Sequence, residues 1–128
     1  MSMGNLAKWD CMEITVSTSD DVTILRLHGK FLAGRDGPLF RQKIQELVDS
    51  GSRKLLLDFS DVPYIDSTGL GFLAGSRRAA QQVGASLVLS SLNERIRHVL
   101  GEVKLADFFV IAADEGAGLA KLKQVSAP

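Results

Sequence analysis

The alternation of apolar and polar residues predicts a sheet that begins with a hairpin. The pattern indicates strands at Glu13–Val16 and Val22–His28, and the second mixes apolar residues with Thr23 and Arg26. Such mixing is typical of a strand with one wetter side. The polar segment Ser17–Asp21 between the two strands predicts a turn. We therefore expect an antiparallel pair.

Three later segments carry apolar residues without a polar alternation. Lys54–Phe59 holds an unbroken apolar run between turn signals, which is typical of a parallel strand buried on both faces. Ser86–Ser90 and Phe108–Ile111 predict a further strand and a last short strand. These segments favour a parallel sheet that follows the hairpin.

Apolar residues at helical spacing separate these strands. Gly37-Pro38 predicts a first helix with proline at its first position, and Gly51 predicts its end. The second helix is expected at Leu70–Val83, where Gly84 stops it. Because this helix connects two predicted parallel strands, the segment forms a right-handed βαβ unit.

Two shorter helices follow near the C-terminus. Ser91 and Glu94 match a capping box, which predicts a helix that ends at Gly101. Asp114 predicts the cap of a terminal helix. With 128 residues the chain makes one α/β domain, which we place at 13–123, between an N-terminal arm, 1–12, and a tail, 124–128.

Composition excludes several classes of function. Fifteen basic residues offset fifteen acidic ones, which argues against a nucleic-acid binder. No apolar run approaches the roughly 18 to 20 residues that cross a bilayer, so we expect no membrane insertion. The single Cys11 cannot form an intrachain disulfide, which fits a reducing compartment. We therefore expect a cytoplasmic protein.

The candidate functional motif lies where the buried strand leads into the second helix. Its residues are Asp66, Ser67, Thr68, Gly69, Leu70 and Gly71. It is not a phosphate-binding Walker loop, since no lysine follows the glycines, and it lacks the Gly-x-Ser-x-Gly of a nucleophile elbow. A hydrolase would need His28 or His98 as its base. Asp58 and Asp66 could together line a polar pocket at the strand's end.

The motif has two interpretations. Asp, Ser and Thr are preferred helix caps, so the segment could serve structure alone. A hydroxyl at an exposed helix N-terminus is also a natural phosphorylation point, because the helix dipole and free N–H groups tolerate the added charge. Beside Asp66, that charge would repel a partner docked on the patch.

The run Leu55–Gly71 resembles the STAS domain of bacterial anti-sigma factor antagonists. The resemblance implies a mixed four- to five-stranded sheet with about four helices, mainly on one face. It implies a non-enzymatic protein that binds an anti-sigma factor, itself a serine kinase, and so controls a sigma factor and transcription. The kinase, which brings its own ATP, would phosphorylate Ser67, with Thr68 as the second acceptor, and a phosphatase would reverse the step. Residues Asp66–Gly71 would form the docking surface, with no cofactor or metal.

One position departs from the family pattern. Leu32 stands where the family often has an aspartate near the phosphorylated serine, while Lys30 and Arg35 bring positive charge to the same loop. This departure leaves a second hypothesis open: an accessory or scaffold STAS subunit of a lipid transport complex or signalling assembly, never phosphorylated. A small hydrolase that uses Ser67 is the third hypothesis.

Overall fold

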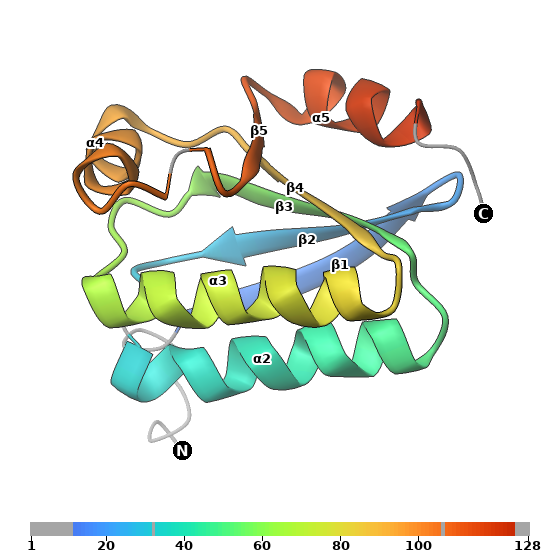
Figure 1. The fold of residues 1–128 in the computed structure, drawn as a ribbon, viewed down its shortest axis with the longest axis horizontal. Helices are drawn as coiled ribbons and strands as arrows, with labels where there is room; N and C mark the ends of the chain where they lie inside the picture. Colours follow the sequence, from blue (N-terminus) through green and yellow to red (C-terminus); the bar gives the residue numbers. More distant parts are fainter. Residues whose placement is uncertain (1–11, 32, 106, 125–128) are drawn as a thin grey trace, which may run out of the picture.

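Five strands form one mixed sheet in the computed structural model, which describes residues 12–31, 33–105 and 107–124. In order across the sheet they are β1 (Glu13–Ser19), β2 (Val22–His28), β3 (Lys54–Asp61), β4 (Ser86–Ser90) and β5 (Val110–Ala112) (Figure 1). β1 is antiparallel to β2, and each later strand is parallel to the one before it. The predicted hairpin and parallel strands are confirmed, but β1 continues to Ser19 and takes in most of the predicted turn, because Ser17–Ser19 pair with β2.

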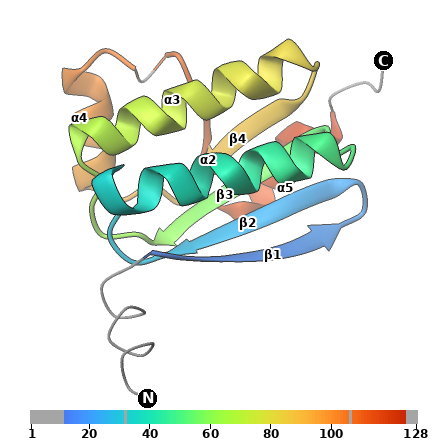
Figure 2. The same cartoon turned by 90° about the horizontal axis from the view of Figure 1, so that it is seen from below.

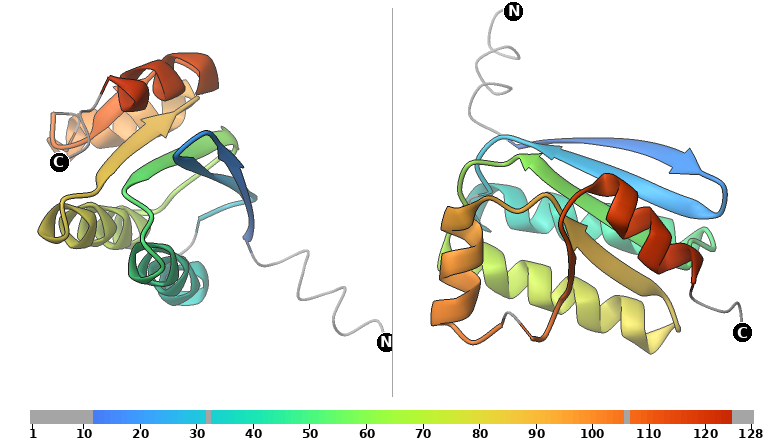
Figure 3. Two further views of the ribbon diagram at one scale, coloured as in Figure 1. Left: turned by 90° about the vertical axis from the view of Figure 1, so that its right-hand side faces the viewer. Right: turned by 90° about the horizontal axis from the view of Figure 1, so that it is seen from above.

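Helices cover both faces of this sheet unequally. The helices in the described part of the chain are α2 (Ala33–Asp49), α3 (Ser67–Gln82), α4 (Glu94–Glu102) and α5 (Glu115–Lys123). α2 and α3 lie side by side on one face (Figure 2), α5 lies on the other, and α4 lies beside the carboxyl ends of the strands (Figure 3). Successive right-handed crossovers in one direction place their helices on the same face. The expected α/β fold is confirmed, with α5 as the exception to its one-sided arrangement.

Strand β3 supplies the centre of both apolar cores. Leu55, Leu57 and Phe59 belong to the larger core under α2 and α3, whereas Leu56 packs with Leu122 of α5 in the smaller one. Successive side chains of a strand point to opposite faces, so an unbroken apolar run fills both sides. The prediction of a doubly buried strand is confirmed.

The predicted start of α2 at Gly37-Pro38 is wrong. The helix begins at Ala33, and Pro38 lies inside it, where it removes one i→i−4 hydrogen bond near the N-terminus. Tertiary contacts offset that loss: the buried Asp36 carboxylate accepts the Met12 backbone N–H at 3.0 Å. A side chain at Gly37 would collide with the Phe72 ring, so this glycine allows α2 and α3 to approach closely.

Two C-terminal elements also differ from expectation. Asn93, not Ser91, caps α4: its side chain accepts the Ile96 N–H at 2.8 Å, while Ser91 has a positive φ of 61°. The helix continues past Gly101 to Glu102, and the last strand starts at Val110 rather than Phe108. Asp114 caps α5 as predicted. In the described ranges no helix is long and apolar enough to cross a membrane.

Candidate functional site

The loops after β2 and β3 are joined at the carboxyl end of the sheet. The Phe31 N–H donates to the Tyr64 carbonyl at 2.9 Å, and the Asp66 N–H donates to the Phe31 carbonyl at 3.2 Å. Phe31 and Ile65 form an isolated parallel bridge, and both side chains are buried. This pairing continues the β2–β3 ladder and fixes the backbone immediately before α3.

Asp66 begins α3 as its N-cap. One of its carboxylate oxygens accepts the Gly69 N–H at 2.6 Å, and its carbonyl accepts the Leu70 N–H at 3.0 Å. The helix therefore starts at Ser67, three residues before the predicted Leu70. An aspartate in this position satisfies an N–H group that the first turn leaves free.

Gly69 is required by this cap. A Cβ at this position would lie 2.9 Å from Ile65 Cγ1, 3.0 Å from Asp66 Oδ1 and 3.1 Å from Phe31 Cδ1. Any larger residue would push against the capping carboxylate and the joined loops. By contrast, a Cβ at Gly71 would meet open space.

The remaining motif residues divide between surface and core. Ser67, Thr68 and Gly71 are exposed, while Leu70 is buried in the larger core. The first turn of α3 contains no acidic residue. The motif thus exposes the hydroxyls of Ser67 and Thr68 and the backbone at Gly71. All three lie at a helix start that the Asp66 cap and the joined loops hold in place.

Arg41 of α2 extends this surface, and sequence reasoning missed it. A hollow of about 240 Å³ is lined by Arg41, Thr68, Gly71 and Phe72. One Arg41 Nη lies 2.9 Å from the point where a Gly75 Cβ would stand, so α3's missing side chain makes room for the guanidinium. The sequence gives no signal for this contact because it depends on the packing of two helices.

The neighbouring loop after β4 also supports the site. The Asn93 side chain donates to the Val62 and Pro63 carbonyls, both at 3.2 Å. Arg95 lies over the Tyr64 ring, with its guanidinium carbon 5.7 Å from the ring centroid. These contacts hold the segment between β3 and α3 from a third side.

Asp58 and Asp66, which could have lined a common polar pocket, lie apart in the structure. Asp58 follows Leu57 on β3 and therefore points to the α5 face, where its carboxylate lies 3.7 Å from Arg26 Nε. Arg26 in turn contacts Glu115 of α5 at 2.7 Å. Alternation along β3 separates Asp58 from the helix cap that Asp66 makes.

The two histidines lie in other settings. His28 contacts Thr15 at 3.2 Å and Asp61 at 2.9 Å. His98 lies exposed on α4, 3.6 Å from Glu102. Lys30 is exposed, whereas Leu32 and the Arg35 side chain lie outside the described part of the structure. Within that part, no cluster of His, Cys, Asp and Glu could hold a metal ion.

Known proteins match both the sequence and this architecture. The sequence profile of the STAS domain matches residues 13–118. The anti-sigma-B factor antagonist of Bacillus subtilis (strain 168) is 34% identical over 82 residues, which are 64% of this chain and 74% of the relative. The crystal structure of TM1081 from Thermotoga maritima aligns with a TM-score of 0.80 and 25% identity, and covers 87% of this chain and 95% of its own. The Bacillus cell fate determinant SpoIIAA, solved in its phosphorylated form, shares the fold: its TM-score is 0.63 at 20% identity, over 82% of this chain and 96% of its own.

Proposed function

The chain belongs to the STAS domain family, and we propose that it is an anti-sigma factor antagonist switched by phosphorylation of Ser67. Unphosphorylated, it binds an anti-sigma factor that is also a serine kinase. Phosphorylation ends the binding, and a serine phosphatase restores it. STAS anti-sigma factor antagonists are non-enzymatic regulators. The observation that carries the proposal is an exposed serine at the first position of a capped helix, beside an exposed backbone surface.

The helix start can accept a phosphate without refolding. A phosphoserine adds about −1.5 to −2 charge near pH 7, and negative charge is favourable at a helix N-terminus. Helices α4 and α5 already carry Glu94 and Glu115 at the position that Ser67 has in α3. A phosphate on Ser67 would therefore give the first position of α3 a negative charge, as Glu94 and Glu115 give α4 and α5.

The same charge would change what can dock there. Ser67, Thr68 and Gly71 face outward together, so a partner seated on this surface would lie against the phosphate. Asp66 adds a second negative charge beside it. Like charges brought together at an interface cost several kcal/mol, which is enough to release a partner while the fold stays intact.

The contacts of the histidines support a binding role rather than hydrolysis. A serine nucleophile needs a base within hydrogen-bond reach. In the described structure the His28 ring already contacts Thr15 and Asp61, and His98 lies on α4 beside Glu102. We therefore propose that the Ser67 hydroxyl accepts a phosphoryl group, which the kinase transfers from its ATP.

The first test is the intact mass, with site mapping, of the protein purified from its native cells with phosphatases blocked. We expect one phosphate on Ser67 whose level changes with growth condition. Thr68→Val should keep the modification, whereas Ser67→Ala should lose it. An unmodified chain in every condition would overturn the switch and favour an accessory STAS subunit.

A further inference from the structure

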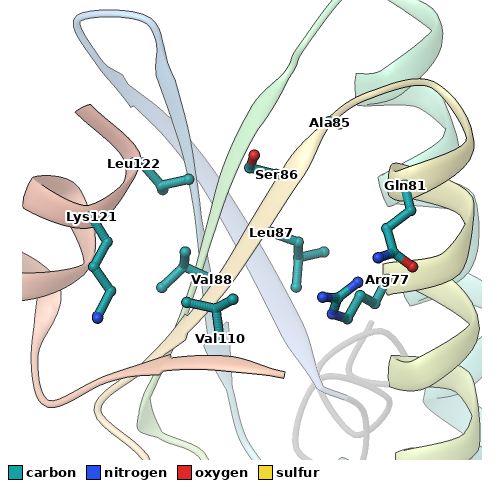
Figure 4. Close-up of a pocket in the computed structure, with 9 residues that line it drawn as sticks. All are labelled: Arg77, Gln81, Ala85, Ser86, Leu87, Val88, Val110, Lys121 and Leu122. Atoms are coloured by element: carbon teal, nitrogen blue, oxygen red, sulfur yellow. The ribbon is translucent and has the colours of Figure 1, made fainter. Parts of the chain in front are cut away.

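A second concave site lies along the outer edge of β4, on the far half of α3 from Ser67. Its volume is about 220 Å³, and its lining comes from α3, β4, β5 and α5 (Figure 4). Nothing in the proposed switch uses this cleft. It exists because β5 has three residues and pairs only with Val88–Ser90, so the beginning of β4 has no neighbour on that side.

The floor of the cleft is apolar. Leu87, Val88, Val110 and Leu122 form it, together with Ala85. Leu87 belongs to the core under α3, whereas Val88 and Leu122 belong to the core under α5. The cleft therefore wraps around the strand edge and meets both faces of the sheet. Val110 is 42% exposed, which leaves part of this floor open to an incoming apolar group.

The backbone of β4 adds a polar edge to this floor. The Ser86 N–H donates toward β3, to the Arg53 carbonyl at 2.8 Å. Successive residues of a strand direct their N–H and C=O groups to alternate edges, so Leu87 directs its groups to the outer edge, where its C=O faces the β5 ladder and its N–H lies beyond the end of β5. Val110, the first residue of β5, pairs one residue further along, with Val88.

The walls of the cleft are positively charged. Arg77 of α3 stands on one side of β4 and Lys121 of α5 on the other, as Figure 4 shows, and none of the described residues that line the cleft is acidic. Gln81 and Ser86 add neutral polar side chains to the lining of the cleft. In a chain whose net charge is zero, this concentration of positive charge is local.

Arg77 carries an unused donor here. In the described part of the chain, its Nε is the one buried side-chain nitrogen or oxygen without a hydrogen-bond partner. The guanidinium carbon lies 5.0 Å from the centre of the Phe108 ring, which holds the side chain in place without satisfying that N–H. A buried donor without a partner costs free energy, and a small shift of the side chain toward a bound acceptor would remove that cost.

We propose that this cleft binds a small amphiphilic carboxylate. The carboxylate lies against Arg77, with Lys121 as the second positive charge, and the apolar body covers Val88, Val110 and Leu122. A volume of about 220 Å³ corresponds to about seven water molecules at roughly 30 Å³ each, which suits a body the size of hexanoate or benzoate.

The test titrates hexanoate into the ¹⁵N-labelled protein and follows amide shifts by NMR. We expect saturable shifts at Leu87, Val88 and Val110, with a dissociation constant on the order of millimolar, as a ligand of this size permits. Hexanamide, which has the same shape and no charge, should bind at least about tenfold more weakly because the charge-assisted hydrogen bond is lost. Equal binding of the two would overturn the proposal.

Variants of neighbouring arginines give a matched control. Arg77→Gln should weaken hexanoate binding about tenfold, while Arg78→Gln should leave it unchanged. Arg78 also lies over the Phe108 ring, at 5.8 Å, but does not line the cleft. If Arg77→Gln fails to fold, the exposed Lys121→Gln must still reduce affinity a few fold.

Ser67→Glu should bind hexanoate as the wild type does, which separates this proposal from the switch. Shifts that map outside the cleft, or no saturable shifts at all, would contradict it.

Discussion

Helices α3, α4 and α5 begin with the same cap and differ at the next residue. Asp66, Asn93 and Asp114 each accept the N–H of the third helical residue, at 2.6, 2.8 and 2.8 Å respectively. After the cap, α4 and α5 continue with a glutamate, but α3 continues with a serine. A capped helix gains from an acidic residue there. The α3 start therefore lacks a stabilising charge that the same chain uses twice elsewhere.

The third residues of the helices show a second difference. α4 and α5 have Ile96 and Ala117 in this position, whereas α3 has Gly69, which is packed against Ile65 and Phe31. The α3 start is thus closely packed at its third residue and is less charged than the starts of α4 and α5. A fixed backbone with an uncharged hydroxyl suits a surface whose charge is set by modification.

The largest expected effect comes from placing a glutamate at the first position of α3, as in α4 and α5. Ser67→Glu should reduce affinity for the anti-sigma factor kinase at least about 100-fold, since like-charge contacts cost several kcal/mol. Unfolding in urea should show equal stability or a gain of about 0.3–1 kcal/mol from the helix dipole. Isothermal titration calorimetry measures the binding.

A serine at the other end of the molecule controls for charge alone. Ser50 is exposed just after α2, at the end of that helix remote from the Asp66 cap. Ser50→Glu adds the same charge there and should leave the affinity within about threefold, because exposed charges more than about 10 Å apart are largely screened. Equal losses for Ser67→Glu and Ser50→Glu would contradict a local switch.

Gly69 and Gly71 should respond in opposite directions to alanine. Gly69→Ala should lower the free energy of unfolding by about 1–3 kcal/mol, because the methyl group overpacks against Ile65 and the Asp66 carboxylate. Gly71→Ala should raise it by about 0.5–1 kcal/mol, since its site is open and alanine favours helix. Urea unfolding measures both. Similar values for the two variants would show that the α3 start is not crowded.

Removal of the caps tests whether α3 is the more firmly anchored start. Asp66→Ala should cost about 2 kcal/mol, the upper end for a cap, because it removes a part-buried, charge-assisted bond of 2.6 Å from the Gly69 N–H. Asp114→Ala, at an exposed cap, should cost about 1 kcal/mol. The two losses are compared from the midpoints of urea unfolding, with one common dependence of the free energy on urea concentration. A larger loss at Asp114 would reverse the order that we infer.

Local patterns predicted the strands and the position of the motif, because periodicity is a property of neighbouring residues. The run at Leu55–Leu57 and the Asp114 cap are found in the structure as expected. Tertiary contacts decided what the patterns missed. Pro38 is held inside α2, partly through the buried Asp36, and Asn93 competes with Ser91 for the α4 cap. In the same way, strand alternation placed Asp58 on the α5 face.

The members of the charged cleft are likewise invisible in the sequence. Arg77 and Lys121 are 44 positions apart and line one cleft only because β5 stops short of the beginning of β4. Helical periodicity alone places Arg77 on the outside of a helix. The fold then covers its Nε without supplying a hydrogen-bond partner.

The smallest expected effect lies at the opposite end of β3 from the α3 start. A hydrogen bond with Lys54, at 2.9 Å, lowers the pKa of the exposed Asp21 below the ordinary aspartate value of 3.8, and the Lys54 charge adds to this. A pKa lowered by folding contributes stability above the unfolded value, and that stability is lost as the pH falls through the folded value. Asp21→Asn should therefore slightly reduce stability at pH 7 and flatten its decline below about pH 4. Partner affinity should not change, because this ion pair is remote from Ser67, and a binding loss in Asp21→Asn would show that docking extends well beyond the α3 start.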